Sequence, residues 1–232
     1  SGKVTIFKED SKLSATQLKD KIAYVPSEPN LYQSWTVDEH IKFVNNLQPI
    51  DQVLSESLKQ KLKLEGGRKI RHLSTGNRQK LAIILALIKK PELLLLDEPT
   101  RGLDPLLRAT LHNLLRDYQK DGGTVLLSSH DLSEVEELCT DLAVIRAGEL
   151  VPSEDIAKLR SIKKHKVKIV FASKPPSLNN LEIEDLAISD KVATLTISGS
   201  LDPLLGELAK HKVKDIEINS ASLEDIFMEI YA

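Results

Sequence analysis

The most informative segment of the sequence is a run of four leucines followed by two acids, Leu93-Leu94-Leu95-Leu96-Asp97-Glu98. A short apolar run suits a central strand of a parallel sheet, because such a strand is buried on both faces. Both carboxylates would then lie at the carboxyl edge of the sheet, where open α/β sheets bind their ligands. Asp97 suits Mg²⁺, which prefers oxygen ligands, and Glu98 can polarise an attacking water. An acidic turn after a core strand is the alternative interpretation.

Strands and helices alternate on both sides of this stretch, which predicts crossover units and a parallel sheet. We expect further strands at 3–7, 22–25, 125–129 and 142–145, and helices at 36–47, 51–64, 76–88, 105–119 and 132–139. The helix after Thr36 opens with a capping box, since Glu39 follows three residues later. Beyond residue 159 the composition changes, and a small α+β domain is expected, with strands at 167–171, 192–197 and 216–218 and helices at 204–211 and 223–231.

Composition and charge exclude several classes of protein. The formal net charge of −2 gives no overall field that would attract nucleic acid or lipid. The single cysteine, Cys139, cannot form an internal disulfide, which fits a reducing compartment. No signal-peptide pattern is found near the N-terminus, and the longest apolar run, 81–88, is shorter than the roughly 20 residues that cross a bilayer. We therefore expect a cytoplasmic chain that does not bind nucleic acid.

Three further motifs flank the acidic stretch. Leu73-Ser74-Thr75-Gly76-Asn77 begins a helix whose free backbone N–H groups can bind a phosphate, although a plain helix cap is the alternative. Gly102-Leu103-Asp104-Pro105 is a turn into the next helix, with Asp104 as its cap. Ser128-Ser129-His130-Asp131 ends the next strand, so His130 would lie beside the acids. There it could donate a hydrogen bond to a γ-phosphate or to the attacking water, or be merely structural.

In this order and spacing, the motifs resemble those of the ABC ATPase family: the signature motif, Walker B with its glutamate, the D-loop and the switch histidine. The resemblance extends over residues 1 to about 160, and the segment 24–29 resembles the Q-loop. The tail, 222–227, resembles the accessory domain of ATPases that serve type-2 exporters. The implied fold is α/β: an incomplete RecA-like parallel-sheet core in 1–162 with an α-helical subdomain at about 34–90, and an accessory α+β domain in 163–232.

The resemblance also implies a function. The parent protein would be an ATPase subunit that powers drug export through a separate transmembrane permease, peripheral at the inner face of the cell membrane and in contact with it only through that permease. ATP and Mg²⁺ would be its cofactors, and a second ATPase subunit, identical or different, its partner. Asp97 would serve Mg²⁺, Glu98 the water and His130 the γ-phosphate, with Asp104 acting across the dimer. The signature residues would face the ATP of the opposite subunit: Leu73, Ser74, Thr75, Gly76 and Asn77.

The sequence departs from the family pattern in four places. Thr75 replaces the first signature glycine, Asn77 replaces a glutamine, and Ser27 stands where the Q-loop glutamine helps with Mg²⁺. The phosphate loop, Gly-x-x-Gly-x-Gly-Lys-Ser/Thr, does not occur, since Val4 follows Gly2-Lys3. We therefore expect a chain that begins downstream of this loop and is inactive alone, because the loop supplies most of the binding to ATP.

Two alternatives to a truncated ATPase remain. The first is a non-catalytic ABC-like module that docks on a permease or on an intact ATPase. The missing phosphate loop and Ser27 favour this module, whereas the intact Glu98 and His130 oppose it. The second is a soluble ABC protein of translation or repair, which is disfavoured because such proteins carry two cassettes or long insertions.

Overall fold

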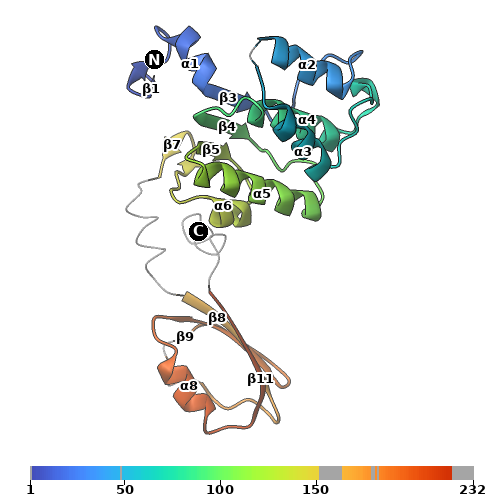
Figure 1. The fold of residues 1–232 in the computed structure, drawn as a ribbon. Coiled ribbons are helices and arrows are strands. Elements are labelled where there is room, and N and C mark those ends of the chain that lie inside the picture. Colours follow the sequence, from blue (N-terminus) through green and yellow to red (C-terminus); the bar gives the residue numbers. More distant parts are fainter. Residues whose placement is uncertain (1, 48, 152–163, 179–180, 182, 221–232) are drawn as a thin grey trace. The chain divides into compact units, whose positions relative to one another are not determined.

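The computed structural model describes residues 2–47, 49–151, 164–178, 181 and 183–220. The chain divides into two compact units, Ser1–Asp131 and Leu132–Ala232, which are described separately here (Figure 1). The first unit contains, in chain order, β1 (Thr5–Ile6), β2 (Glu9–Asp10), α1 (Ala15–Lys21), β3 (Ile22–Val25), α2 (Val37–Leu47), α3 (Gln52–Lys61), η1 (Ile70–His72), α4 (Thr75–Leu87), β4 (Leu93–Asp97), α5 (Pro105–Lys120) and β5 (Thr124–Ser128).

A parallel sheet of three strands, in the order β3-β4-β5, forms the centre of the first unit and confirms the predicted α/β class. Helix α4 packs against β3, and α5 packs against β5. Side chains alternate along β4, so that Leu94 and Leu96 are buried whereas Leu93 and Leu95 are half-buried. Beside Leu95, Tyr24 and Leu126 are 60% and 65% exposed. The expected burial of β4 on both faces is therefore complete on one face only.

Side-chain caps fix where the helices of the first unit begin. The predicted capping box of α2 is confirmed: the Glu39 N–H donates to Thr36 Oγ1 at 3.2 Å, and the Thr36 N–H donates to Glu39 Oε2 at 2.6 Å. Hydrogen bonds from Thr36 lower the pKa of the Glu39 carboxyl, the bond from the Thr36 backbone being the larger cause. Asp51 caps α3 by accepting from the Leu54 N–H. These caps supply acceptors for N–H groups that have no partner within their helix.

The strand expected at 142–145 as part of the parallel sheet is wrong. Only Ile145–Arg146 form a strand, β6, which pairs antiparallel with β7 (Glu149–Leu150). The two linking residues, Ala147 and Gly148, have φ of 50° and 85°. Two left-handed residues close a tight hairpin, because their twist matches that of the paired strands. The chain therefore turns back locally after Arg146 instead of joining β3, β4 and β5.

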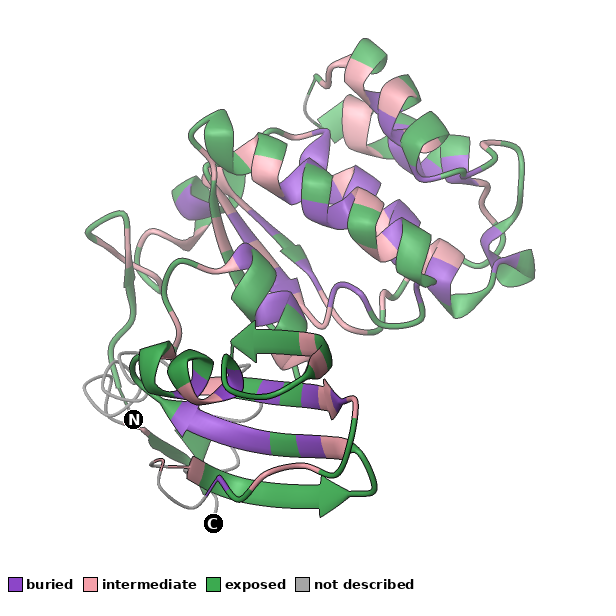
Figure 2. Ribbon diagram, turned by 90° about the horizontal axis from the view of Figure 1, so that it is seen from below, coloured by how far each residue is buried: buried purple, intermediate pink, exposed green. Residues whose placement is uncertain are grey.

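The second unit is mainly an antiparallel sheet with one helix on one face. Its elements are α6 (Leu132–Leu138), β6, β7, β8 (Lys164–Phe171), β9 (Ile183–Ser189), β10 (Val192–Ser198), α8 (Asp202–Leu208) and β11 (Val213–Ser220). The four-stranded sheet has the order β11-β8-β10-β9. The apolar face of this sheet forms a core with Leu204 and Leu208 of α8. Figure 2 shows the strand part of this core as buried residues along the central strands.

The sequence analysis did not predict strand β9, whose residues are mostly exposed in the structure. The helix expected at 223–231 lies outside the described residues. Of the helices in the described part of the chain, none combines the length and the hydropathy that a membrane-spanning segment requires.

Candidate functional site

Asp97 and Glu98 lie together at the carboxyl edge of the parallel sheet, as predicted. The register pairs Asp97 of β4 with Ser128 of β5. The Ser128 hydroxyl donates to Asp97 Oδ1 at 2.6 Å. The Glu98 N–H lies 3.1 Å from the Ser128 carbonyl oxygen and 3.3 Å from its Oγ. Both acids are therefore tied to the end of the neighbouring strand.

Glu98 has a left-handed backbone, with φ of 49°. This conformation is uncommon for a residue other than glycine, and it turns the chain sharply at the end of β4. Such conformations cost free energy and cluster at functional sites. The hydrogen bonds from the Glu98 N–H to Ser128 hold the turn in place.

His130 lies beside Glu98, as the sequence predicted. Its Nδ1 is 2.6 Å from Glu98 Oε2, and the His130 side chain is 82% exposed whereas that of Glu98 is 24% exposed. The bond fixes the direction of the Glu98 carboxylate and leaves the far side of the imidazole open to solvent. A carboxylate held by an imidazole is an arrangement that can orient and deprotonate a water.

The start of α4 forms a second part of the candidate site. Ser74 caps the helix by accepting from the Asn77 N–H at 3.2 Å, and both Ser74 and Thr75 are exposed. The N–H groups of a helix start are suited to a phosphate. Gly76 is buried, and a Cβ there would lie 2.4 Å from the carbonyl oxygen of Gly102. Glycine at position 76 therefore lets the two predicted motifs, which are distant in sequence, come into contact.

Leu73 differs from the other residues of the 73–77 motif. Its side chain is 4% exposed and packs in the core of the unit. A nucleotide could reach only the backbone at this position.

Asp104 and the loop of His130 are linked through Arg108. Asp104 Oδ1 accepts from the Leu107 N–H at 3.0 Å and so caps α5. Arg108 Nε donates to the Leu103 carbonyl at 3.2 Å, and its Nη1 donates to Asp131 Oδ2 at 3.2 Å. The guanidinium group therefore connects the turn before α5 to the residue that follows His130.

Ser27 lies in the loop after β3 and is half-buried. The flanking residues hold this loop at two points. Gln79 Nε2 lies 3.5 Å from the carbonyl oxygen of Pro26, and Arg101 Nη1 is 3.4 Å from Glu28 Oε1. The loop is thus joined to α4 and to the turn after β4. The hydrogen bonds of Asp97 and Glu98 described above join them to Ser128 and His130 rather than to Ser27.

The residues present fit a magnesium ion that is shared with a nucleotide. No group of three His, Cys, Asp or Glu side chains in the described residues could hold a metal ion alone. Mg²⁺ in phosphoryl-transfer sites is typically held by one or two carboxylates, with phosphate oxygens and water completing its shell. Asp97 can supply such a carboxylate, because Ser128 occupies only its Oδ1.

Three residues of the site were not singled out from the sequence. Ser128, Arg101 and Arg108 each join elements that are distant in sequence. Ser128 could have been found by aligning the ends of the two expected strands, since parallel strands bring their carboxyl ends to one edge. Nothing local marks Arg101 or Arg108, because the carboxylates that they bind, Glu28 and Asp131, belong to other loops.

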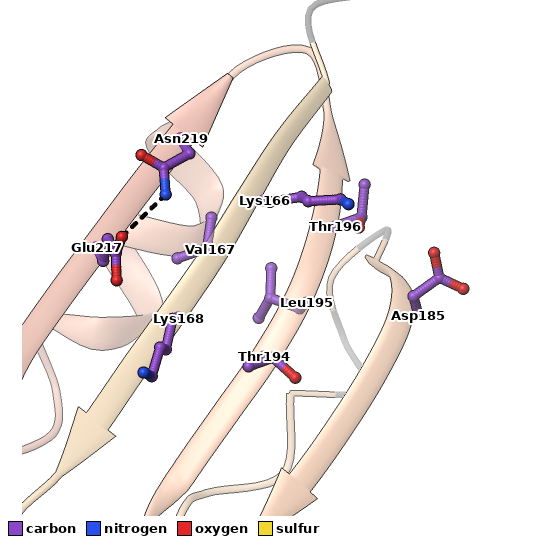
Figure 3. Close-up of a pocket in the computed structure, with 9 residues that line it drawn as sticks. All are labelled: Lys166, Val167, Lys168, Asp185, Thr194, Leu195, Thr196, Glu217 and Asn219. Carbon is purple, nitrogen blue, oxygen red and sulfur yellow. Dashed lines mark hydrogen bonds between the residues drawn. The ribbon is translucent and has the colours of Figure 1, made fainter. Parts of the chain in front are cut away.

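A separate pocket of about 380 Å³ lies on the polar face of the sheet in the second unit. Figure 3 shows its lining side chains on β8, β9, β10 and β11: Lys166, Val167, Lys168, Asp185, Thr194, Leu195, Thr196, Glu217 and Asn219. Asn219 Nδ2 donates to Glu217 Oε1 at 3.1 Å, and Glu217 pairs in register with Lys168. Opposite charges on neighbouring strands stabilise a solvated sheet face.

Comparisons with known proteins give consistent results. A family model described as "AAA domain, putative AbiEii toxin, Type IV TA system" matches residues 2–136, more than half of the chain. The uncharacterised ABC transporter ATP-binding protein YhaQ of Bacillus subtilis is 30% identical over 228 residues, which cover 91% of this chain and 75% of that protein. The fluoroquinolones export ATP-binding protein of Mycobacterium tuberculosis (strain ATCC 25618 / H37Rv) is 25% identical over 236 residues, covering 99% of this chain and 74% of the relative.

A solved structure of an ATP-binding subunit of an ABC transporter has a similar fold. Its TM-score is 0.64 at 20% identity, and the match covers 100% of this chain and 77% of that one. At this identity the likeness bears on the fold alone.

Proposed function

The chain belongs to the family of ABC transporter ATP-binding proteins, and on that premise we propose that it is the ATP-hydrolysing subunit of a drug exporter. The observation that carries the proposal is the bond between His130 Nδ1 and Glu98 Oε2, 2.6 Å long, at the sheet edge that also holds Asp97. The similarity to a fluoroquinolone-export protein supports export as the direction of transport.

Each residue of the sheet edge has a role in the proposed hydrolysis. Glu98 orients the attacking water and accepts its proton, and His130 holds the Glu98 carboxylate and reaches the γ-phosphate. Asp97 holds Mg²⁺, which when bound neutralises charge on the triphosphate. The exposure of His130 leaves this edge open to a nucleotide.

The proposed partners are a second ATPase subunit and a transmembrane permease. Ser74 and Gly76 of one subunit face the γ-phosphate of the ATP held by the other, and Asp104 acts across the same interface. Contact between the turn of Gly102 and the start of α4 supports this pairing, because it lets one subunit present both motifs together. Closing on ATP and opening after hydrolysis would drive the permease through a shift between two states. Membrane contact is proposed to occur only through the permease, at the cytoplasmic face.

We further propose that residues 1–232 do not hold ATP by themselves. The described sheet edge carries two acids, Asp97 and Glu98, and carboxylates repel a triphosphate unless cations or backbone N–H groups offset their charge. In P-loop ATPases the phosphate loop provides that compensation.

Calorimetric titration with ATP and Mg²⁺ tests the proposal on two proteins. One is the chain itself, and the other is a fusion in which the phosphate-loop segment of an ABC subunit precedes Ser1. We expect only the fusion to bind ATP and to hydrolyse it. ATP binding by the chain alone would overturn the proposed need for the loop.

Glu98→Gln in the fusion tests the catalytic role. We expect this variant to bind ATP, to lose at least about 100-fold in turnover, and to accumulate as an ATP-bound dimer. The matched control is Glu92→Gln, just before the other end of β4, where the glutamate pairs with Lys21. Equal turnover in the Glu98→Gln and Glu92→Gln fusions would refute a catalytic role for Glu98 and favour a non-catalytic module.

A further inference from the structure

We infer that Ser128 is a positioning residue, which orients the Asp97 carboxylate through its hydroxyl and holds the Glu98 backbone through that hydroxyl and its carbonyl oxygen. This inference rests on the proposed function, because it concerns the carboxylates that would serve Mg²⁺ and water. It adds a residue that has no expected contact with the nucleotide itself.

The register between β4 and β5 places Ser128 within hydrogen-bonding distance of both acids. It is the last residue of β5 and pairs with Asp97, the last residue of β4. The Oγ–Oδ1 distance of 2.6 Å is that of a short hydrogen bond to a charged acceptor. From the next residue along, the Glu98 N–H reaches the same Ser128 Oγ at 3.3 Å and the carbonyl at 3.1 Å.

A hydroxyl suits this position because it can donate and accept at once. Its single proton goes to Asp97 Oδ1, so its lone pairs face the Glu98 N–H. Asp97 is thereby held in one rotamer, with Oδ2 left to meet a cation or a cation-bound water. Groups that orient a metal-binding carboxylate in this way typically contribute about 10- to 100-fold to metal affinity.

Ser129 does not substitute for Ser128. Its hydroxyl accepts from the Asp131 N–H at 3.0 Å, which holds the loop of His130 rather than the acids. Adjacent residues of an extended segment also point to opposite faces. Removal of the Ser128 hydroxyl therefore leaves Asp97 without this donor.

The test measures the Asp97 rotamer directly in the isotopically labelled full chain. Three-bond couplings from Asp97 Cγ to its backbone nitrogen and carbonyl carbon distinguish one fixed rotamer from an average. We expect a single rotamer in the unmodified chain, averaged couplings in Ser128→Ala, and recovery in Ser128→Thr, which keeps the hydroxyl. Thr124→Ala is the control, because it removes a hydroxyl from the same face of β5 at its other end.

Unchanged Asp97 couplings in Ser128→Ala would overturn the inference, as would equal averaging in Thr124→Ala. A second readout uses the phosphate-loop fusion: the Mg²⁺ concentration for half-maximal turnover should rise by about 10-fold in Ser128→Ala and return in Ser128→Thr. No shift in that concentration would also count against the role of Ser128. Failure of the unmodified fusion to hydrolyse ATP would refute the proposed function, while the couplings would still decide the role of Ser128.

Discussion

Gly76 allows the first turn of α4 to approach the carbonyl of Gly102, and Gly76→Ala should force the two apart. The added Cβ would lie 2.4 Å from the Gly102 oxygen, whereas ordinary contacts begin at 3.4 Å. The backbone of one motif must therefore move by about 1 Å, because the obstacle is a carbonyl and not a side chain that can rotate.

The cost follows from two opposing effects. Overpacking of this kind costs about 1–3 kcal/mol, and alanine in a helix recovers up to about 1 kcal/mol relative to glycine. We expect a net loss of about 1–2 kcal/mol in the free energy of unfolding of the first unit. The same displacement would separate the two motifs that the proposed dimer needs together, so turnover by the phosphate-loop fusion should fall as well.

Urea unfolding followed by the fluorescence of Trp35 measures this loss, since Trp35 is the only tryptophan and lies in the first unit. The control is Gly67→Ala, where a Cβ would meet no atom within 4 Å and where we expect a change within about 0.5 kcal/mol. Equal stability of the two alanine variants would refute the argument from close approach.

Three further changes test other contacts. Tyr118→Phe removes the hydroxyl that donates to the Pro91 carbonyl at 2.6 Å, and should cost about 1 kcal/mol in urea unfolding. Burial raises the pKa of Tyr118, so the phenol keeps its proton to a higher pH in the folded state than in the unfolded state. The unmodified chain should therefore lose stability above about pH 10 more steeply than this variant. The pKa of Glu39 is lowered below its ordinary 4.5, so its stabilisation is present above pH 4.5 and is lost as the pH falls; acid unfolding followed by circular dichroism should be less steep in Glu39→Gln. Arg108→Lys should speed amide hydrogen exchange around Asp131, because a lysine cannot keep both bonds of the guanidinium, and unchanged exchange would contradict this link.

Local signals in the sequence predicted most helices and strands of the first unit. The apolar run before Asp97 predicted β4, and Thr36 with Glu39 predicted the start of α2. Pro105 was expected at the first position of α5 and lies there. Such features succeed because burial of a short apolar run and capping of a helix depend on residues close together in sequence.

Two expectations about the sheet were wrong, one because of a local turn and one because of tertiary packing. The segment ending at Ile145 is apolar enough for a core strand, but the turn at Ala147 and Gly148 closes a hairpin instead. Strand β4 was expected to be buried on both faces, yet Tyr24 and Leu126 beside it are 60% and 65% exposed. An apolar run indicates that a strand can be buried on both faces, whereas the elements packed on each side of the sheet decide whether it is.

The sequence alone determined the family motifs, the α/β class and the residues able to do acid–base chemistry, because these depend on residue type and spacing. Tertiary structure decided which of those residues meet. The register of β4 and β5 brings Ser128 to Asp97, and the left-handed turn at Glu98 brings its carboxylate to His130. The absence of a side chain at Gly76 allows the Gly102 carbonyl to lie close to it. Each contact joins segments that are about 25 or more residues apart, and only the packing of the whole unit fixes the distance between them.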